Sequence, residues 1–294
     1  MTESPSGSSP INTTNVIGGL AREHPLISFF CLAYMLGWAA LLPLVLTNIG
    51  LGVIRRDIGI EWIVPATFSP TVAALWIHWL LHRNFRFVRL FPSAWRALLG
   101  LLVGVGLVVF AFSVFPAILL AEAPIRAIHW SALLAPATYA VNWSTVFGGP
   151  LGEEPGWRGF ALSRMQSRFG PTRGSVLLGI LWTGWHLPLF LLHGWSNVPL
   201  WAFALMLVAA SILFTYAVNL SRGSAMVAIL LHATFNTSFG ILASLCHGIP
   251  TRNPDLPYYL CAAVVTALAT SLLTRGQLGV DKGFGDHEAF DRPS

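Results

Sequence analysis

The stretch that decides the fold is Leu200–Leu220, which reads LWAFALMLVAASILFTYAVNL. It contains no Asp, Glu, Lys or Arg, and its length matches the about 20 apolar residues that a helix needs to cross a bilayer. Seven more apolar runs have comparable lengths and lie at residues 25–46, 62–81, 97–120, 131–149, 175–192, 224–245 and 258–273. The sequence therefore predicts an all-α, polytopic membrane protein with about eight transmembrane helices.

The overall composition agrees with this fold class. Of the 294 residues, 55% are apolar and 10% are charged, whereas an ordinary soluble domain has about 25% charged residues. The mean hydropathy is +0.67. These values exclude a soluble globular enzyme and a disordered chain, and the three cysteines show no CxxC pair or disulfide framework. The pI of about 9.6 does not indicate nucleic acid, because the basic residues lie in short loops, where they favour contact with the anionic lipid of a bilayer.

The chain divides into a long apolar domain between two tails. Residues 1–24 are rich in Ser, Thr, Pro and Gly and predict a disordered tail without a signal peptide. Residues 25–275 predict one transmembrane domain, and residues 276–294 a C-terminal tail. Twelve Lys and Arg residues fall on the side of both termini and four on the other, with Arg158 left out because it lies in a polar cluster. This asymmetry places both termini in the cytoplasm.

Three polar clusters interrupt the apolar region. They are GEEPGWRGF at residues 152–160, WTGWH at residues 182–186 and HATFN at residues 232–236. Ionisable side chains inside a bilayer are costly and usually functional. Asp is absent from all eight runs, and neither GxSxG nor HExxH occurs, so the common aspartyl, serine and zinc hydrolase patterns are missing.

The spacing of these clusters places them at similar depths. At about 1.5 Å per helical residue, His186 and Asn236 lie roughly 18 Å, and His232 roughly 12 Å, from the cytoplasmic ends of their helices. The segment that carries Glu153 is too long for one span and breaks at the glycines and prolines of residues 148–155. We therefore expect two histidines, an asparagine and a glutamate to meet in an intramembrane cavity that is reached from the cytoplasm.

Such a group suits the direct hydrolysis of an amide bond. A carboxylate beside an imidazole can deprotonate a water molecule, and a second imidazole with an amide can stabilise an oxyanion. Glu154 and Arg158 have the spacing of an ion pair, which would neutralise one of two adjacent carboxylates. Other interpretations stay open, because span histidines also bond across helices and an acidic pair also begins helices in solvent. A solute transporter is less favoured, because no internal repeat is evident.

These residues resemble the motifs of the CPBP intramembrane endopeptidases, which include CAAX prenyl proteases of the Rce1 type and the bacteriocin-processing and Abi proteins. The family motif EExxxR is matched by Glu153, Glu154 and Arg158. The second motif, an aromatic residue four positions before His, is matched by Trp182 and His186, where many members have Phe. The third motif, HxxxN, is matched by His232 and Asn236. The resemblance covers residues 131–244.

The resemblance implies a role for each matching residue. Glu153 corresponds to the glutamate that activates water with help from His186, and His232 with Asn236 to the pair that stabilises the oxyanion. Glu154 and Arg158 correspond to the supporting pair.

The resemblance also implies a membrane-embedded or lipidated peptide substrate, either CAAX-type or bacteriocin-like, in a bacterial plasma membrane. No cofactor is favoured; if zinc is bound, its ligands would be His186, His232 and Glu153. The alternative is a catalytically inactive binding or immunity protein on the same fold.

Overall fold

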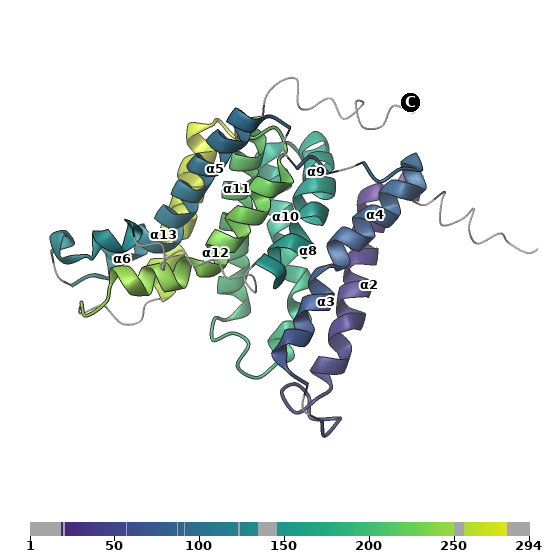
Figure 1. Cartoon of the computed structure of the whole chain (residues 1–294), viewed down its shortest axis with the longest axis horizontal. Coiled ribbons are helices and arrows are strands. Elements are labelled where there is room, and N and C mark those ends of the chain that lie inside the picture. The colour runs from purple at the N-terminus through teal and green to yellow at the C-terminus, as the bar shows by residue number, and fades with distance from the viewer. Residues whose placement is uncertain are drawn as a thin grey trace, which may run out of the picture.

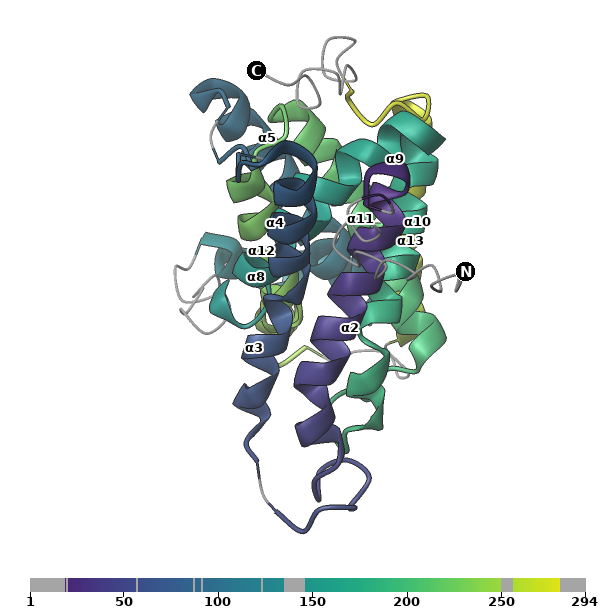
Figure 2. The ribbon, with the colours of Figure 1, turned by 90° about the vertical axis from the view of Figure 1, so that its right-hand side faces the viewer.

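The computed structural model describes residues 19, 21–56, 58–86, 88–90, 92–122, 124–134, 146–249 and 256–280. These residues form a bundle of helices (Figures 1 and 2). Its longer helices are α2 (Pro25–Val45), α4 (Ser69–His82), α5 (Ala94–Val109), α10 (Pro171–Trp185), α11 (Leu200–Leu220), α12 (Ala225–Leu245) and α13 (Leu256–Leu273). The shorter ones are α3 (Ile63–Thr67), α6 (Phe115–Leu120), α8 (Pro150–Glu154) and α9 (Leu162–Phe169). The fold class is all-α, as the sequence predicts.

Six helical segments are long and apolar enough to cross a bilayer. They span residues 25–45, 60–82, 94–120, 200–220, 225–245 and 256–273, and each boundary lies within three residues of the sequence-based prediction. The chain is therefore an integral, multi-pass membrane protein. Short breaks divide two of these segments, since α3 meets α4 at Phe68 and a π-helical stretch, Phe110–Val114, joins α5 to α6.

Two of the eight predicted spans differ from the structure or lie outside it. Most of the run at residues 131–149 falls outside the described residues, so the total of eight stays a prediction. The run expected at residues 175–192 begins earlier, with Pro171, and its α-helix ends at Trp185. A 3₁₀ turn, Leu187–Leu191, follows. Pro188 explains the early end, because it lacks an N–H and its ring would clash with the carbonyl of Gly184.

The short helix α8 lies in the middle of the bundle between α4 and α12 (Figure 1). Two glycines allow this close approach. A Cβ atom on Gly152 would lie 2.7 Å from the carbonyl oxygen of Thr67, and one on Gly156 would lie 2.5 Å from that of Pro70. Both contacts are with backbone atoms, which cannot move aside as a flexible side chain could. Small residues at such crossings are the usual way in which membrane helices pack closely.

After α8 the chain continues as a π-helical stretch, Pro155–Ala161, and then as α9. The wider turn of a π-helix often marks a functional site. Beyond α13 the chain packs back onto the bundle, since Leu278 is fully buried and its carbonyl accepts a hydrogen bond from Asn219 Nδ2 at 2.8 Å. The predicted C-terminal tail therefore begins with residues that belong to the packed structure, whereas residues 281–294 lie outside the described part.

Candidate active site

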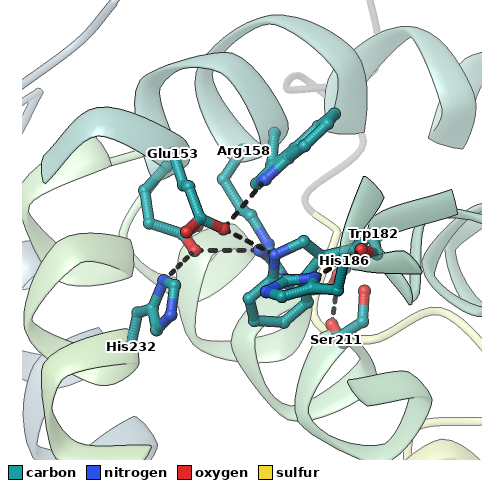
Figure 3. Close-up of polar contacts among 9 residues, drawn as sticks. Glu153, Arg158, Trp182, His186, Ser211 and His232 are labelled. Atoms are coloured by element: carbon teal, nitrogen blue, oxygen red, sulfur yellow. Dashed lines mark hydrogen bonds and ion pairs between the residues drawn. The ribbon is translucent and has the colours of Figure 1, made fainter. Parts of the chain in front are cut away.

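Five of the predicted site residues meet in the interior of the bundle (Figure 3). Glu153 and Glu154 end the short helix α8, Arg158 follows in the π-helical stretch, His186 caps α10, and His232 lies on α12. Their exposed fractions are 9% or less. Five ionisable side chains at this burial need partners, because an isolated charge costs several kcal/mol in a medium of low dielectric constant.

Glu154 is the carboxylate whose charge is balanced. Its Oε1 accepts hydrogen bonds from Arg158 Nη1 at 2.9 Å and from His232 Nδ1 at 2.8 Å. The guanidinium of Arg158 lies over the rings of Trp182 and Phe214, with its Cζ 4.4 Å and 5.0 Å from their centroids. The Glu154–Arg158 ion pair is the one that the four-residue spacing predicts, whereas the sequence reasoning missed the bond from His232 to the same oxygen.

Glu153 has a different set of partners. Its Oε2 accepts a hydrogen bond from Trp182 Nε1 at 2.6 Å and a longer one from Trp157 Nε1 at 3.3 Å. Its Oε1 lies toward Gly149, since a Cβ atom on that glycine would be 3.1 Å from Oε1 and 3.8 Å from His232 Nε2. The missing side chain of Gly149 therefore leaves space beside one carboxylate oxygen and one imidazole nitrogen.

The orientation of His186 follows from the end of α10. Its Nδ1 lies 2.7 Å from the carbonyl oxygen of Trp182, and because a carbonyl only accepts, Nδ1 carries the proton. In the neutral ring, Nε2 then holds a free lone pair. Glu153 interacts electrostatically with this ring, and the aromatic rings of Trp195 and Phe203 lie 6.1 Å and 5.2 Å from it.

Asn236 is the predicted site residue that the structure does not bring into this network. It lies one turn beyond His232 on α12, and its side chain is exposed, whereas His232 is 4% exposed. Helical spacing puts the two residues on neighbouring parts of one face, but the packing against α8 covers only the first of them. A role for Asn236 in catalysis stays a prediction.

Sequence reasoning also missed the two indole donors and Gly149. Trp182 was noted only as the aromatic residue of its cluster. The sequence does contain a signal for Trp182. A buried Trp usually finds a hydrogen-bond partner for its N–H, and Glu153 and Glu154 are among the few charged acceptors in the apolar region. Gly149 was treated as a helix breaker, and nothing in the sequence shows which side chains face it.

A zinc site needs three or four His, Cys, Asp or Glu ligands around one point. Among residues 19–280, as far as the structure describes them, no group of three or more His, Cys, Asp or Glu side chains is arranged to hold a metal ion. The alternative set of His186, His232 and Glu153 uses both Nδ1 atoms and one carboxylate oxygen in bonds to protein groups. A zinc-bound His usually donates its other ring N–H in this way, so the choice between a metal-free site and a zinc site stays a prediction.

Comparison with known proteins shows what the segment that carries this site is similar to. Residues 135–238 match the family described as type II CAAX prenyl endopeptidase, Rce1-like. CAAX prenyl protease 2 of Methanococcus maripaludis is 33% identical over 99 residues, which are 31% of this chain and 36% of that protein. This segment of the chain is similar to the Rce1-like family. The five residues of the EExxxR and HxxxN motifs lie within the matched segment, as does His186, whereas α2 to α6 lie before it. The chain spans about a third of its curated relative.

Proposed function

We propose that this Rce1-like chain is an intramembrane endopeptidase in which Glu153 activates a water molecule. The observation that carries the proposal is that two adjacent buried carboxylates have different hydrogen-bond partners. Glu154 is bound to a guanidinium and an imidazole, whereas Glu153 has indole donors on one oxygen and presents the other toward the space beside Gly149. Carboxylates whose environments differ in this way take different roles in acid–base catalysis.

The hydrolytic step proceeds without a covalent intermediate. Glu153 Oε1 accepts a proton from water while the water oxygen attacks the carbonyl carbon of the scissile peptide bond. His186 Nε2 accepts the second hydrogen bond of the same water and orients it. When the tetrahedral intermediate collapses, the C–N bond breaks and Glu153 returns its proton to the leaving amine. The products are a new carboxylate and a new amine, and the enzyme ends in its starting state.

The oxyanion of the intermediate is stabilised by His232 and Asn236. Because His232 Nδ1–H donates to Glu154, its Nε2 carries a proton only when the ring is an imidazolium. Glu154 binds both Arg158 and His232, so it holds the imidazole whose Nε2 lies beside Gly149. Asn236 supplies the second donor once the substrate occupies the exposed side of α12. Removal of one such donor typically costs about 10²–10³-fold in turnover.

The proposed substrate is a membrane-anchored peptide, either of the CAAX type with a prenyl group or bacteriocin-like. The family name and the name of the relative support a prenylated substrate, and the depth of the site within the bundle supports one that enters from the lipid. The proposed setting is a bacterial plasma membrane with both termini in the cytoplasm, which the twelve-to-four distribution of Lys and Arg supports.

The test is cleavage by the purified chain in liposomes. Two reporter peptides of the same sequence, one with and one without a prenyl group, are incubated with the wild-type chain, and products are identified by mass spectrometry. We expect cleavage at an internal peptide bond, faster for the prenylated reporter. Single-turnover cleavage in ¹⁸O-labelled water should place one ¹⁸O atom in the new carboxylate and none in Glu153, whereas an anhydride on Glu153 that water opens at the glutamyl carbonyl would release unlabelled product and leave the label on Glu153.

A second arm of the same assay addresses the alternatives. Stringent chelation should leave the activity unchanged, and loss of activity that zinc restores would replace this mechanism by a metal-activated water. Reporter binding without cleavage would indicate the non-enzymatic binding protein instead.

A further inference from the structure

Trp182 lies at the centre of the site, although its side chain has no group that could react with a substrate. Its indole N–H donates to Glu153 Oε2 at 2.6 Å, and its backbone carbonyl accepts the hydrogen bond of His186 Nδ1 at 2.7 Å. Its ring also meets His232 edge to face, with centroids 5.0 Å apart, and carries the guanidinium of Arg158 on its face. One residue therefore contacts every ionisable group of the site except Glu154 (Figure 3).

We infer that the indole N–H of Trp182 is a positioning group for the general base. The inference rests on the proposed function, since it presumes that Glu153 takes the proton of the attacking water. The hydrogen bond directs Oε2 toward α10, which leaves Oε1 as the oxygen that faces Gly149 and His232 Nε2. Trp182 is 1% exposed, so no solvent molecule replaces this bond if the N–H is removed.

The same bond supplies the Glu153 carboxylate with a donor inside the bundle. A hydrogen bond to a carboxylate stabilises the charged form relative to the neutral acid, and bonds to charged groups are about twice as strong as neutral ones. Trp157 adds a longer bond of 3.3 Å to the same oxygen. The mechanism needs the carboxylate form, because a protonated Glu153 cannot accept a proton from water.

A change at Trp182 substitutes none of the other charged and titratable groups around Glu153. They are Glu154 and Arg158 on its own segment, His186 at the end of α10 and His232 on α12. The neighbouring helices α3 and α4 contribute the hydroxyl groups of Thr67 and Thr71, of which the second donates to the carbonyl of Gly152 at 2.6 Å. A shift in the titration of Glu153 in Trp182→Phe therefore reports on the lost N–H together with the ring contacts of Trp182 to Arg158 and His232.

The test compares Trp182→Phe with Trp185→Phe. Phe keeps an aromatic ring and the backbone carbonyl but has no N–H. Trp185 is a matched control, because it lies on the same helix, is also 1% exposed and donates its N–H at 3.0 Å, but to Ser69 Oγ. Each variant loses one buried hydrogen bond. Only the bond lost in Trp182→Phe has the Glu153 carboxylate as its acceptor.

Two measurements are made on the full chain in detergent or nanodiscs. In the cleavage assay, Trp182→Phe should lower kcat about 10- to 100-fold, the loss expected for one hydrogen bond to a charged group, while KM changes less than about threefold. The acidic limb of its pH–rate profile should move up by about one to two pH units. Trp185→Phe should leave the profile in place, whatever its effect on thermal stability.

The second measurement does not depend on activity. Difference infrared spectroscopy follows the carboxyl stretch of Glu153 during a pH titration, and the band is assigned by its loss in Glu153→Gln. We expect its midpoint to rise in Trp182→Phe and to stay unchanged in Trp185→Phe. Equal midpoints in the two variants would overturn the inference. A wild-type chain that cleaves nothing but shows the shift would refute the proposed function and leave the role of the indole N–H standing.

Discussion

Removal of the charge on Glu154 should destabilise the fold, and the structure indicates by how much. Glu154→Gln preserves the size of the side chain and keeps one oxygen as an acceptor. Arg158 and the imidazolium form of His232 then lose their common counter-charge in an interior where both residues are less than 5% exposed. Arg158 Nε and Nη2 have no hydrogen-bond partner in the described structure, so Nη1 makes the guanidinium's one hydrogen bond to a carboxylate.

The expected loss is about 3–5 kcal/mol, the cost of breaking a buried ion pair by removing one member. A typical domain unfolds with about 5–15 kcal/mol, so Glu154→Gln should be folded only marginally. Replacing both members is less harmful than replacing one, because no uncompensated charge remains. The double variant Glu154→Gln/Arg158→Met should therefore be more stable than Glu154→Gln alone by at least about 1 kcal/mol.

The assay is reversible unfolding by dodecyl sulfate in mixed micelles, followed by circular dichroism. Glu23→Gln is the matched control, because Glu23 is exposed and its neutralisation should change the free energy of unfolding by less than about 0.5 kcal/mol. Wild-type stability in Glu154→Gln would refute the reasoning. So would a double variant that is no more stable than the single one, since the cost would then not arise from a stranded charge.

Three further predictions follow from packing and charge. Gly156→Ala should lower the thermal midpoint sharply, because its Cβ would meet the Pro70 backbone at 2.5 Å, and a normal melting curve would show that α4 and the π-helical stretch can separate. Gly149→Ala should reduce kcat while the melting temperature stays within a few degrees, because its Cβ would fill the space beside Glu153 Oε1. Full activity in this variant would show that the attacking water does not occupy that space. Reporter fusions after Arg222 should be cytoplasmic and fusions near Arg126 should lie on the opposite side, and the reverse result would refute the orientation.

The sequence predicts the transmembrane part of the fold well for a physical reason. A lipid-exposed helix must be apolar over its whole length, so the ends of helices such as α11 and α12 are visible in the hydropathy pattern alone. The end of α10 was placed too late because apolar residues continue to Leu192. There the backbone is set by Pro188 and by the hydrogen bond of His186 to a carbonyl, and hydropathy does not register either effect.

The candidate site was predicted in part. The spacing of residues 153, 154 and 158, with the two histidines at similar depths, indicates five side chains that do meet in the structure. Which carboxylate takes which partner was not visible, because that depends on how α8 is rotated against α10 and α12. The glycines of this segment also pack against the backbone of Thr67 and Pro70, on α3 and α4, and one sequence does not show these contacts. The exposure of Asn236 depends on the same rotation.

The most direct test of the account is the turnover of Glu153→Gln on a reporter peptide that the wild-type chain cleaves. The control is Glu61→Gln, in which an exposed carboxylate is neutralised in the same way. The account predicts that Glu153→Gln is folded, inserted in the membrane and able to capture the reporter, but has no measurable cleavage, because no base remains to take the proton of water. Turnover in Glu153→Gln within about tenfold of the wild-type value would contradict it, since loss of the essential base should cost far more than one tenfold step.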